Sequence, residues 1–95
     1  MENTHRSIEE FLIALSNETR RKMITVIGQA RELNVNQITG HFNLSRPNIS
    51  HHLGILKRAG LLKTRKEGKE TYYSVNKQFI LDSLRGFIDY MEKCC

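Results

Sequence analysis

The sequence has no tryptophan, one proline and only two cysteines among its 95 residues. Because Cys94 and Cys95 are adjacent at the end of the chain, they cannot build the disulfide framework of a small secreted domain. No apolar run approaches the ~18 residues of a membrane span, and no secretory signal opens the chain. We therefore expect a cytoplasmic protein with no membrane partner, in which both thiols are kept reduced.

Motifs typical of enzymes are also missing. The sequence contains no glycine-rich phosphate loop, no nucleophile elbow, no HExxH motif and no convincing pair of catalytic carboxylates. We expect neither an enzyme nor a cofactor. The chain is short enough to form one domain, residues 1–95, because domains run to about 100–200 residues. A chain of this length buries only roughly 60–65% of its unfolded surface, and a homodimer would relieve that shortage.

Positive charge is concentrated in one third of the chain. Residues 1–44 and residues 74–95 each carry equal numbers of basic and acidic side chains. Residues 45–73 carry seven basic side chains against two acidic ones, which accounts for the whole net charge of +5. A basic segment of this kind is typical of a surface that binds polyanions such as DNA, although a solvated basic surface is the alternative.

Capping residues and helical spacing predict five helices. Ser7, with Glu10 three residues later, has the form of a capping box at the start of the first helix. The second is predicted to begin after Asn17 and a short third helix after Asn34. Ser45 is the predicted N-cap of the fourth helix, which extends to Ala59. Asn76 is the predicted cap of the last helix.

A β-hairpin is predicted between the fourth and last helices. Gly60 is placed as the helix stop, and residues 61–66 and 71–75 have the composition of strands. Gly68 and Lys69 lie between them as a turn. The predicted fold is therefore mainly α with a small β-hairpin, in the order α-α-α-α-β-β-α. A short helix closely followed by another, and then by a hairpin, is typical of a winged helix-turn-helix domain.

The fourth helix has a polar face that suits base recognition. Its apolar face carries Ile49, His52, Leu53 and Leu56, so His52 is interpreted as a packed, hydrogen-bonded residue. Recognition helices touch base edges with their N-terminal residues. Arg46, Asn48 and His51 are therefore the predicted base contacts, since arginine and asparagine pair with guanine and adenine through two hydrogen bonds.

The hairpin supplies most of the predicted contacts to the DNA backbone. Hydroxyl and cationic groups bind phosphates without reading sequence. The predicted backbone contacts are Ser45, Ser50, Lys63, Arg65, Lys66 and Lys69. Of Tyr72 and Tyr73, one is expected to pack inward and the other to face outward, because side chains alternate along a strand.

Four segments together form a specific pattern that spans nearly the whole chain: ALSNETRR (14–21), LSRPNISHHL (44–53), LKRAGLL (56–62) and KEGKETYYSV (66–75). They resemble the ArsR/SmtB family of bacterial winged-helix repressors. The SHHL run and the short ends further resemble its SdpR-type autorepressors. The resemblance implies a homodimeric repressor of a palindromic operator, joined through its first and last helices. The apolar stripe of the last helix supports a dimer independently. The residues expected at the dimer interface are Ile8, Phe11, Leu12, Leu84, Phe87, Ile88 and Met91.

The metal sites of this family are not carried over to the sequence. The stretch 33–44 has no cysteine for the site at the third helix, and the last helix has Asp82, Asp89 and Glu92 but no histidine. We therefore expect no metal. Cys94 and Cys95 leave open an arsenite- or redox-responsive sensor, against an exposed tail with incidental thiols. A protein-interaction module on the same scaffold is a further alternative.

Overall fold

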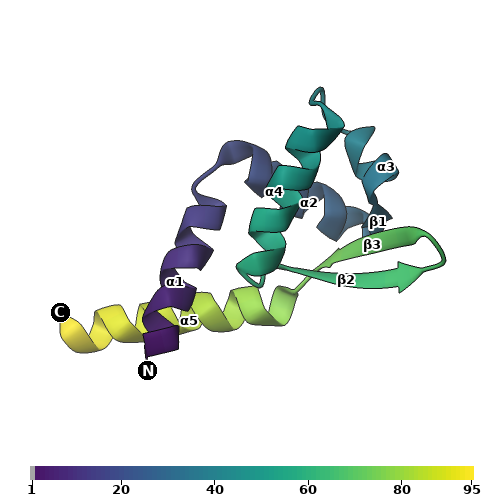
Figure 1. Cartoon of the computed structure of the whole chain (residues 1–95). Coiled ribbons are helices and arrows are strands. Elements are labelled where there is room, and N and C mark those ends of the chain that lie inside the picture. The colour runs from purple at the N-terminus through teal and green to yellow at the C-terminus, as the bar shows by residue number, and fades with distance from the viewer. Residues whose placement is uncertain (1) are drawn as a thin grey trace.

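The computed structural model describes residues 2–95, with side chains from Ile8 onward. Helices and a small sheet alternate along these residues, and α4 lies beside the hairpin while α5 runs along the base of the molecule (Figure 1). The elements are α1 (Glu2–Leu15), α2 (Glu18–Ala30), β1 (Leu33–Asn34), α3 (Val35–Thr39), α4 (Arg46–Arg58), β2 (Leu62–Glu67), β3 (Glu70–Val75) and α5 (Lys77–Cys94).

Four of the five predicted caps are confirmed. The side chains of Asn17, Asn34, Ser45 and Asn76 each accept a hydrogen bond from the backbone N–H three residues later. The prediction for Ser7 is wrong, because α1 begins at Glu2 and already includes this residue. A serine followed by a glutamate three positions later also fits inside a helix, so the pattern alone did not locate its start.

The sheet has one more strand than predicted. The hairpin of β2 and β3 turns at Gly68 and Lys69, as expected, and the two-residue strand β1 pairs antiparallel with β3. The strand order is therefore β1-β3-β2. Leu33 lies opposite Tyr73. A strand of two residues shows no alternation of apolar and polar side chains, which explains why the sequence did not predict it.

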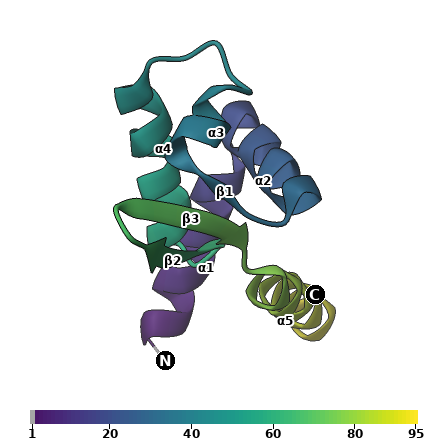
Figure 2. The same cartoon turned by 90° about the vertical axis from the view of Figure 1, so that its right-hand side faces the viewer.

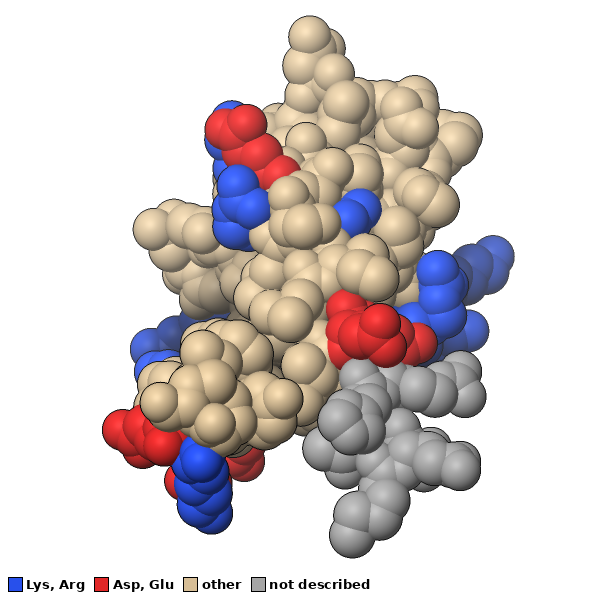
Figure 3. Space-filling model, turned by 90° about the vertical axis from the view of Figure 1, so that its left-hand side faces the viewer, with Lys and Arg blue, Asp and Glu red and all other residues tan. Residues whose placement is uncertain are grey.

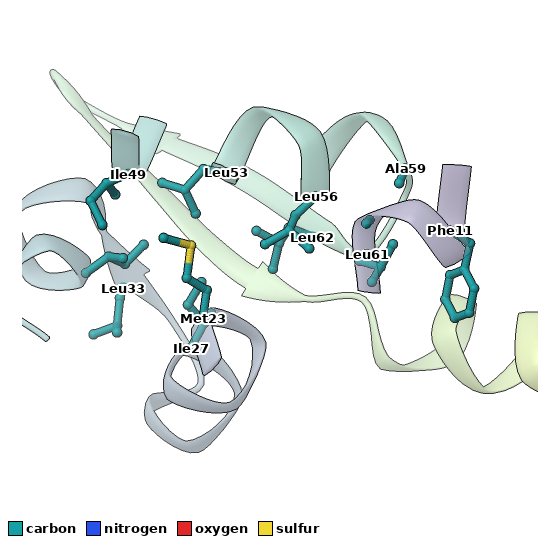
Figure 4. Packing of buried hydrophobic residues seen from close by; sticks show 12 residues of the cluster. Phe11, Met23, Ile27, Leu33, Ile49, Leu53, Leu56, Ala59, Leu61 and Leu62 are labelled. Atoms are coloured by element: carbon teal, nitrogen blue, oxygen red, sulfur yellow. The ribbon is translucent and has the colours of Figure 1, made fainter. Parts of the chain in front are cut away.

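The hydrophobic core lies between α1, α2, α4 and the sheet. Figure 4 shows Met23 and Ile27 of α2 together with Leu33 and with Ile49 and Leu53 of α4. Residues from the start of the hairpin and from α1 extend the cluster toward α5. The other buried members are Phe11, Ala14, Ile38, Leu56, Ala59, Leu61 and Leu62.

Gly60 connects α4, the hairpin and α5. It ends α4, as predicted, with a φ of 89° that side-chain-bearing residues rarely adopt. A Cβ at this position would lie only 2.8 Å from the ring of Phe79 on α5. Both the backbone conformation and the close approach of the aromatic ring therefore require glycine.

Arg20 joins α1 to α4 from inside the protein. Only 8% of its surface is exposed, and its Nε and Nη2 donate to the carbonyls of Ala14 and Ile13 at 2.8 and 3.0 Å. These carbonyls belong to the last turn of α1, where the helix supplies no i+4 N–H donors, although the Ile13 carbonyl also accepts from Ser16. Nη1 of Arg20 lies 3.2 Å from Nδ1 of His52. Because arginine only donates, His52 accepts this bond as a neutral imidazole.

Replacing Gly60 with alanine should destabilise the fold through both constraints. We expect Gly60→Ala to lower the free energy of unfolding by about 2–4 kcal/mol, from left-handed strain together with overpacking against Phe79. The measurement is denaturant unfolding followed by circular dichroism. Gly68→Ala is the matched control, because Gly68 has a φ of 63° but open space around its Cβ position. Equal losses in the two variants would show that the Phe79 contact contributes nothing.

His52 should make the stability of the domain depend on pH. Burial, with smaller effects from the charges of Arg20 and His51, lowers the pKa of His52 below its usual value. The unfolded chain then binds the proton more readily, so the free energy of unfolding should fall as the pH drops from about 7.5 to 5. In His52→Gln, whose amide oxygen can still accept from Arg20, this dependence should be shallower. Denaturant unfolding at several pH values checks it. The exposed His51→Gln is the control, and matching profiles for wild type and His52→Gln would contradict the expectation.

Candidate nucleic-acid interface

The N-terminal half of α4 presents a row of polar side chains to solvent. Pro47 occupies the first turn, and the Ser45 hydroxyl accepts from the Asn48 N–H at 3.3 Å, which leaves its own proton free to donate. Ile49 and Leu53 are buried, so the opposite face must point outward. The exposed side chains here are Ser45, Arg46, Asn48, Ser50 and His51.

All predicted residues of the recognition helix are exposed at the start of α4. Arg46, Asn48 and His51, the predicted base contacts, lie within the first two turns of α4. Their contact with bases stays a prediction. His52 is half-buried and bonded to Arg20, which agrees with its interpretation as a packed, hydrogen-bonded residue.

The hairpin, or wing (residues 62–75), extends from the body next to α4 (Figure 1). Lys63, Lys66 and Lys69 are exposed along it. Within residues 8–95, whose side chains the structure describes, none of these three lysines forms an ion pair. Their charges are therefore available to an anionic partner such as a phosphate backbone.

Arg65 differs from these lysines because its side chain has partners within the protein. Its Nε and Nη2 donate to the carboxylate of Glu32 at 2.9 and 2.7 Å, and its Nη1 donates to Glu67 at 2.6 Å. These carboxylates, Glu32 first, raise the pKa of Arg65, and Arg65 in turn lowers that of Glu32. Two carboxylates occupy all three guanidinium nitrogens. The Arg65 side chain is still 50% exposed, so its contact with the DNA backbone stays a prediction.

The two adjacent tyrosines of β3 point to opposite faces of the sheet, as predicted. Tyr73 packs against the hydrophobic core. Tyr72 lies on the outer face, where the guanidinium of Arg65 is 4.9 Å from the centre of its ring. The outer tyrosine therefore supports Arg65 through a cation–π contact.

An apolar stripe covers the outer sides of α1 and α5. Figure 2 shows α5 end-on, apart from α3 and α4, and Figure 3 shows a broad area of uncharged side chains with charged ones around it. Ile8 is half-buried at one edge. The exposed large apolar residues of this stripe are Leu12, Leu84, Phe87, Ile88, Tyr90 and Met91. Ile13 is exposed too, but it lies beside Ile55 and Ala59 at the end of α4.

Phe11 does not belong to this stripe. Only 3% of its surface is exposed, and its ring packs edge-on against Phe79 with centroids 6.2 Å apart. The expectation that Phe11 contacts a partner chain is therefore wrong, because the side chain is already buried within the protomer. Tyr90, which the sequence analysis did not assign to the stripe, is exposed next to Phe87.

The sulfurs of Cys94 and Cys95 lie next to each other at the end of α5. The expectation that both thiols are kept reduced stays a prediction. Among the side chains that the structure describes, no group of three histidine, cysteine, aspartate or glutamate residues is arranged to hold a metal ion. No helix within residues 2–95 has the length and apolar character needed to cross a membrane.

The sequence analysis missed two residues that support this interface. Arg20 holds α1 against α4, and Glu32 holds Arg65 of the wing. Both act on partners more than 30 residues away, at His52 and Arg65. A buried arginine and an acidic residue outside the basic segment give no periodic signal, so only the three-dimensional contacts reveal them.

The sequence of this chain matches a known protein family. Residues 17–64, which include α2, α3 and α4, match the family model of the bacterial regulatory protein, arsR family. The transcriptional repressor SdpR of Bacillus subtilis is 36% identical over 80 residues, which cover 84% of this chain and 88% of the repressor. The arsenic resistance transcriptional regulator ArsR1 of Pseudomonas putida is 36% identical over 78 residues, which cover 79% of this chain and 61% of that protein.

Solved structures agree with the sequence relatives. An ArsR-like transcriptional regulator from Rhodococcus sp. RHA1 superimposes with a TM-score of 0.86 at 25% identity, over 96% of this chain and 85% of the other. HlyU from Vibrio cholerae does so with a TM-score of 0.71 at 27% identity, over 98% and 96% of the two chains. The fold is thus a winged helix-turn-helix, and these relatives are regulators, not enzymes. The chain belongs to the ArsR family of bacterial regulatory proteins and is a DNA-binding transcriptional regulator.

Proposed function

We propose that this protein is a cytoplasmic transcriptional repressor that binds a palindromic operator as a homodimer. The observation that carries the proposal is the exposed polar start of α4 lying beside a wing with three unpaired lysines. Members of this family generally bind DNA as dimers, and the relative SdpR is named a transcriptional repressor. Two-fold symmetry would place the two α4 helices ~34 Å apart, which is about one turn of DNA.

The polar start of α4 and the lysines of the wing have separate roles in this proposal. Arg46, Asn48 and His51 read base edges in the major groove, while Ser45 and Ser50 donate to phosphates near the start of the helix. The wing holds the DNA backbone through exposed lysines, which give attraction without sequence preference. The predicted lysines for this role are Lys63, Lys66 and Lys69.

The apolar stripe of α1 and α5 is the proposed dimer interface. Ile88 is 56% exposed and Met91 44% exposed in the protomer, and such a concentration of apolar side chains is typical of a surface that another chain covers. Ile8, Leu12, Leu84 and Phe87 complete the expected set, from which Phe11 has been removed. Pairing through this stripe leaves α4 and the wing free to face DNA (Figure 1).

Substitutions in α4 and in the wing should change DNA binding in different ways. We expect Asn48→Ala and His51→Ala to lose about 1–3 kcal/mol on the preferred site while binding to other sequences changes little. Lys69→Ala should weaken all duplexes alike and reduce the slope of affinity against salt by about one unit. Sites would be selected from random DNA and affinities measured by fluorescence anisotropy at two salt concentrations.

The control for that experiment is Lys93→Ala, at the end of α5 far from the wing, where Lys93 pairs with Asp89. It should leave affinity unchanged. Uniform losses from Asn48→Ala, His51→Ala and Lys69→Ala would reject the division of roles. Failure of the wild-type protein to select any sequence would reject the repressor itself.

A charge in the middle of the apolar stripe should break the dimer. We expect Ile88→Glu to convert the protein to a monomer, because like charges would meet in an apolar interface without partners. Light scattering after size-exclusion chromatography would measure the mass, which should drop from twice the chain mass to one chain mass. Because Ile88 lies outside the protomer core, circular dichroism should be unchanged. Asp82→Lys, outside the stripe, is the control, and a dimeric Ile88→Glu would place the interface elsewhere.

A further inference from the structure

Arg65 crosses the whole sheet to reach Glu32. It starts on β2, passes over the ring of Tyr72 on β3, and ends at the residue just before β1. Because the strand order is β1-β3-β2, this one side chain connects the two edges of the sheet. The two bonds to the Glu32 carboxylate, at 2.9 and 2.7 Å, are bidentate, so they fix direction as well as distance.

Glu32 sits at the point where the wing meets the helix-turn-helix. It follows α2 and precedes β1, which leads directly into α3 at Val35. The backbone pairing between β1 and β3 is only two residues long, whereas β2 and β3 pair over six. The wing is therefore a well-paired hairpin with a weakly paired attachment to the helices that face DNA, and the Arg65–Glu32 contact reinforces that attachment.

We propose that Glu32 is a positioning residue for DNA binding, which holds the wing at a fixed angle to α3 and α4 through Arg65. The inference deepens the proposed function and rests on it, since it assumes that α4 and the wing engage one duplex together. The guanidinium of Arg65 lies against the ring of Tyr72, and its Nη1 donates a further hydrogen bond to the carboxylate of Glu67. The contact lies on the outer face of the sheet, away from the core. It can therefore orient the wing without being needed for the domain to stay folded.

Simple electrostatics makes the opposite prediction. Glu32 is an acidic residue near a surface that binds a polyanion, so removing its charge should strengthen binding to every duplex. If Glu32 instead positions the wing, its removal should weaken binding, because part of the binding free energy is then spent on ordering the hairpin. The sign of the change in affinity therefore distinguishes a positioning role from a mere surface charge.

The test measures affinity for the selected DNA site with Glu32→Ala, Arg65→Ala and the double variant. We expect each single variant to bind about three- to tenfold more weakly, and the double variant to bind no more weakly than Arg65→Ala. Arg65→Lys keeps the charge but loses the bidentate geometry, so it should also weaken binding. Glu70→Ala is the matched control, because it removes an exposed acidic residue of the wing and should leave binding equal or tighter.

A second measurement follows the wing in the free protein. Hydrogen exchange read by mass spectrometry should show faster exchange of the β2 and β3 amides in Glu32→Ala than in wild type or Glu70→Ala, with helix amides unchanged. Glu32→Ala that binds DNA as tightly as wild type, or exchanges no faster, would overturn the inference. If wild type binds no DNA, the proposed function fails, while the exchange measurement still tests the contact itself.

Discussion

Burial of one face of α4 is the constraint on which the rest of the structure depends. Ile49, Leu53 and Leu56 are almost completely removed from solvent, and each such side chain contributes roughly 1.5–3 kcal/mol when buried. Rotation of the helix about its axis would expose all three. The spacing that builds the core therefore also decides that Asn48 and His51 face outward, so the choice of the residues proposed to face DNA follows from packing.

Polar contacts hold the elements at the edge of this small core in place. A chain of this length leaves a large share of its surface exposed, so elements at the edge of the core have few apolar partners. Arg20 fastens the end of α1 to α4, and Arg65 fastens the wing to the start of β1. Both use the planar guanidinium, which makes several directed hydrogen bonds at once. Directional contacts of this kind define orientation where packing alone does not.

The sequence predicted features that depend on neighbouring residues and missed those that depend on distant ones. The caps at Asn34 and Ser45 and the stop at Gly60 are local patterns, and the structure confirms them. Phe11 was misassigned because α1 is apolar on two sides, and periodicity does not tell which side faces the core. The pairing of Arg65 was missed because nothing near it in sequence reveals that Glu32, 33 residues away, binds it.

The junction at Gly60 connects the proposed dimer helices to the elements proposed to face DNA. Gly60 ends α4, touches Phe79 of α5, and is followed by Leu61, whose carbonyl accepts from the N–H of Asn76 at 2.9 Å. Asn76 in turn caps α5 directly after β3. α4, the wing and α5 thus meet within a few residues and without a flexible linker. In a dimer paired through α1 and α5, the separation of the two α4 helices would be set by this junction, so geometry fixed inside one protomer would determine which operator spacing fits.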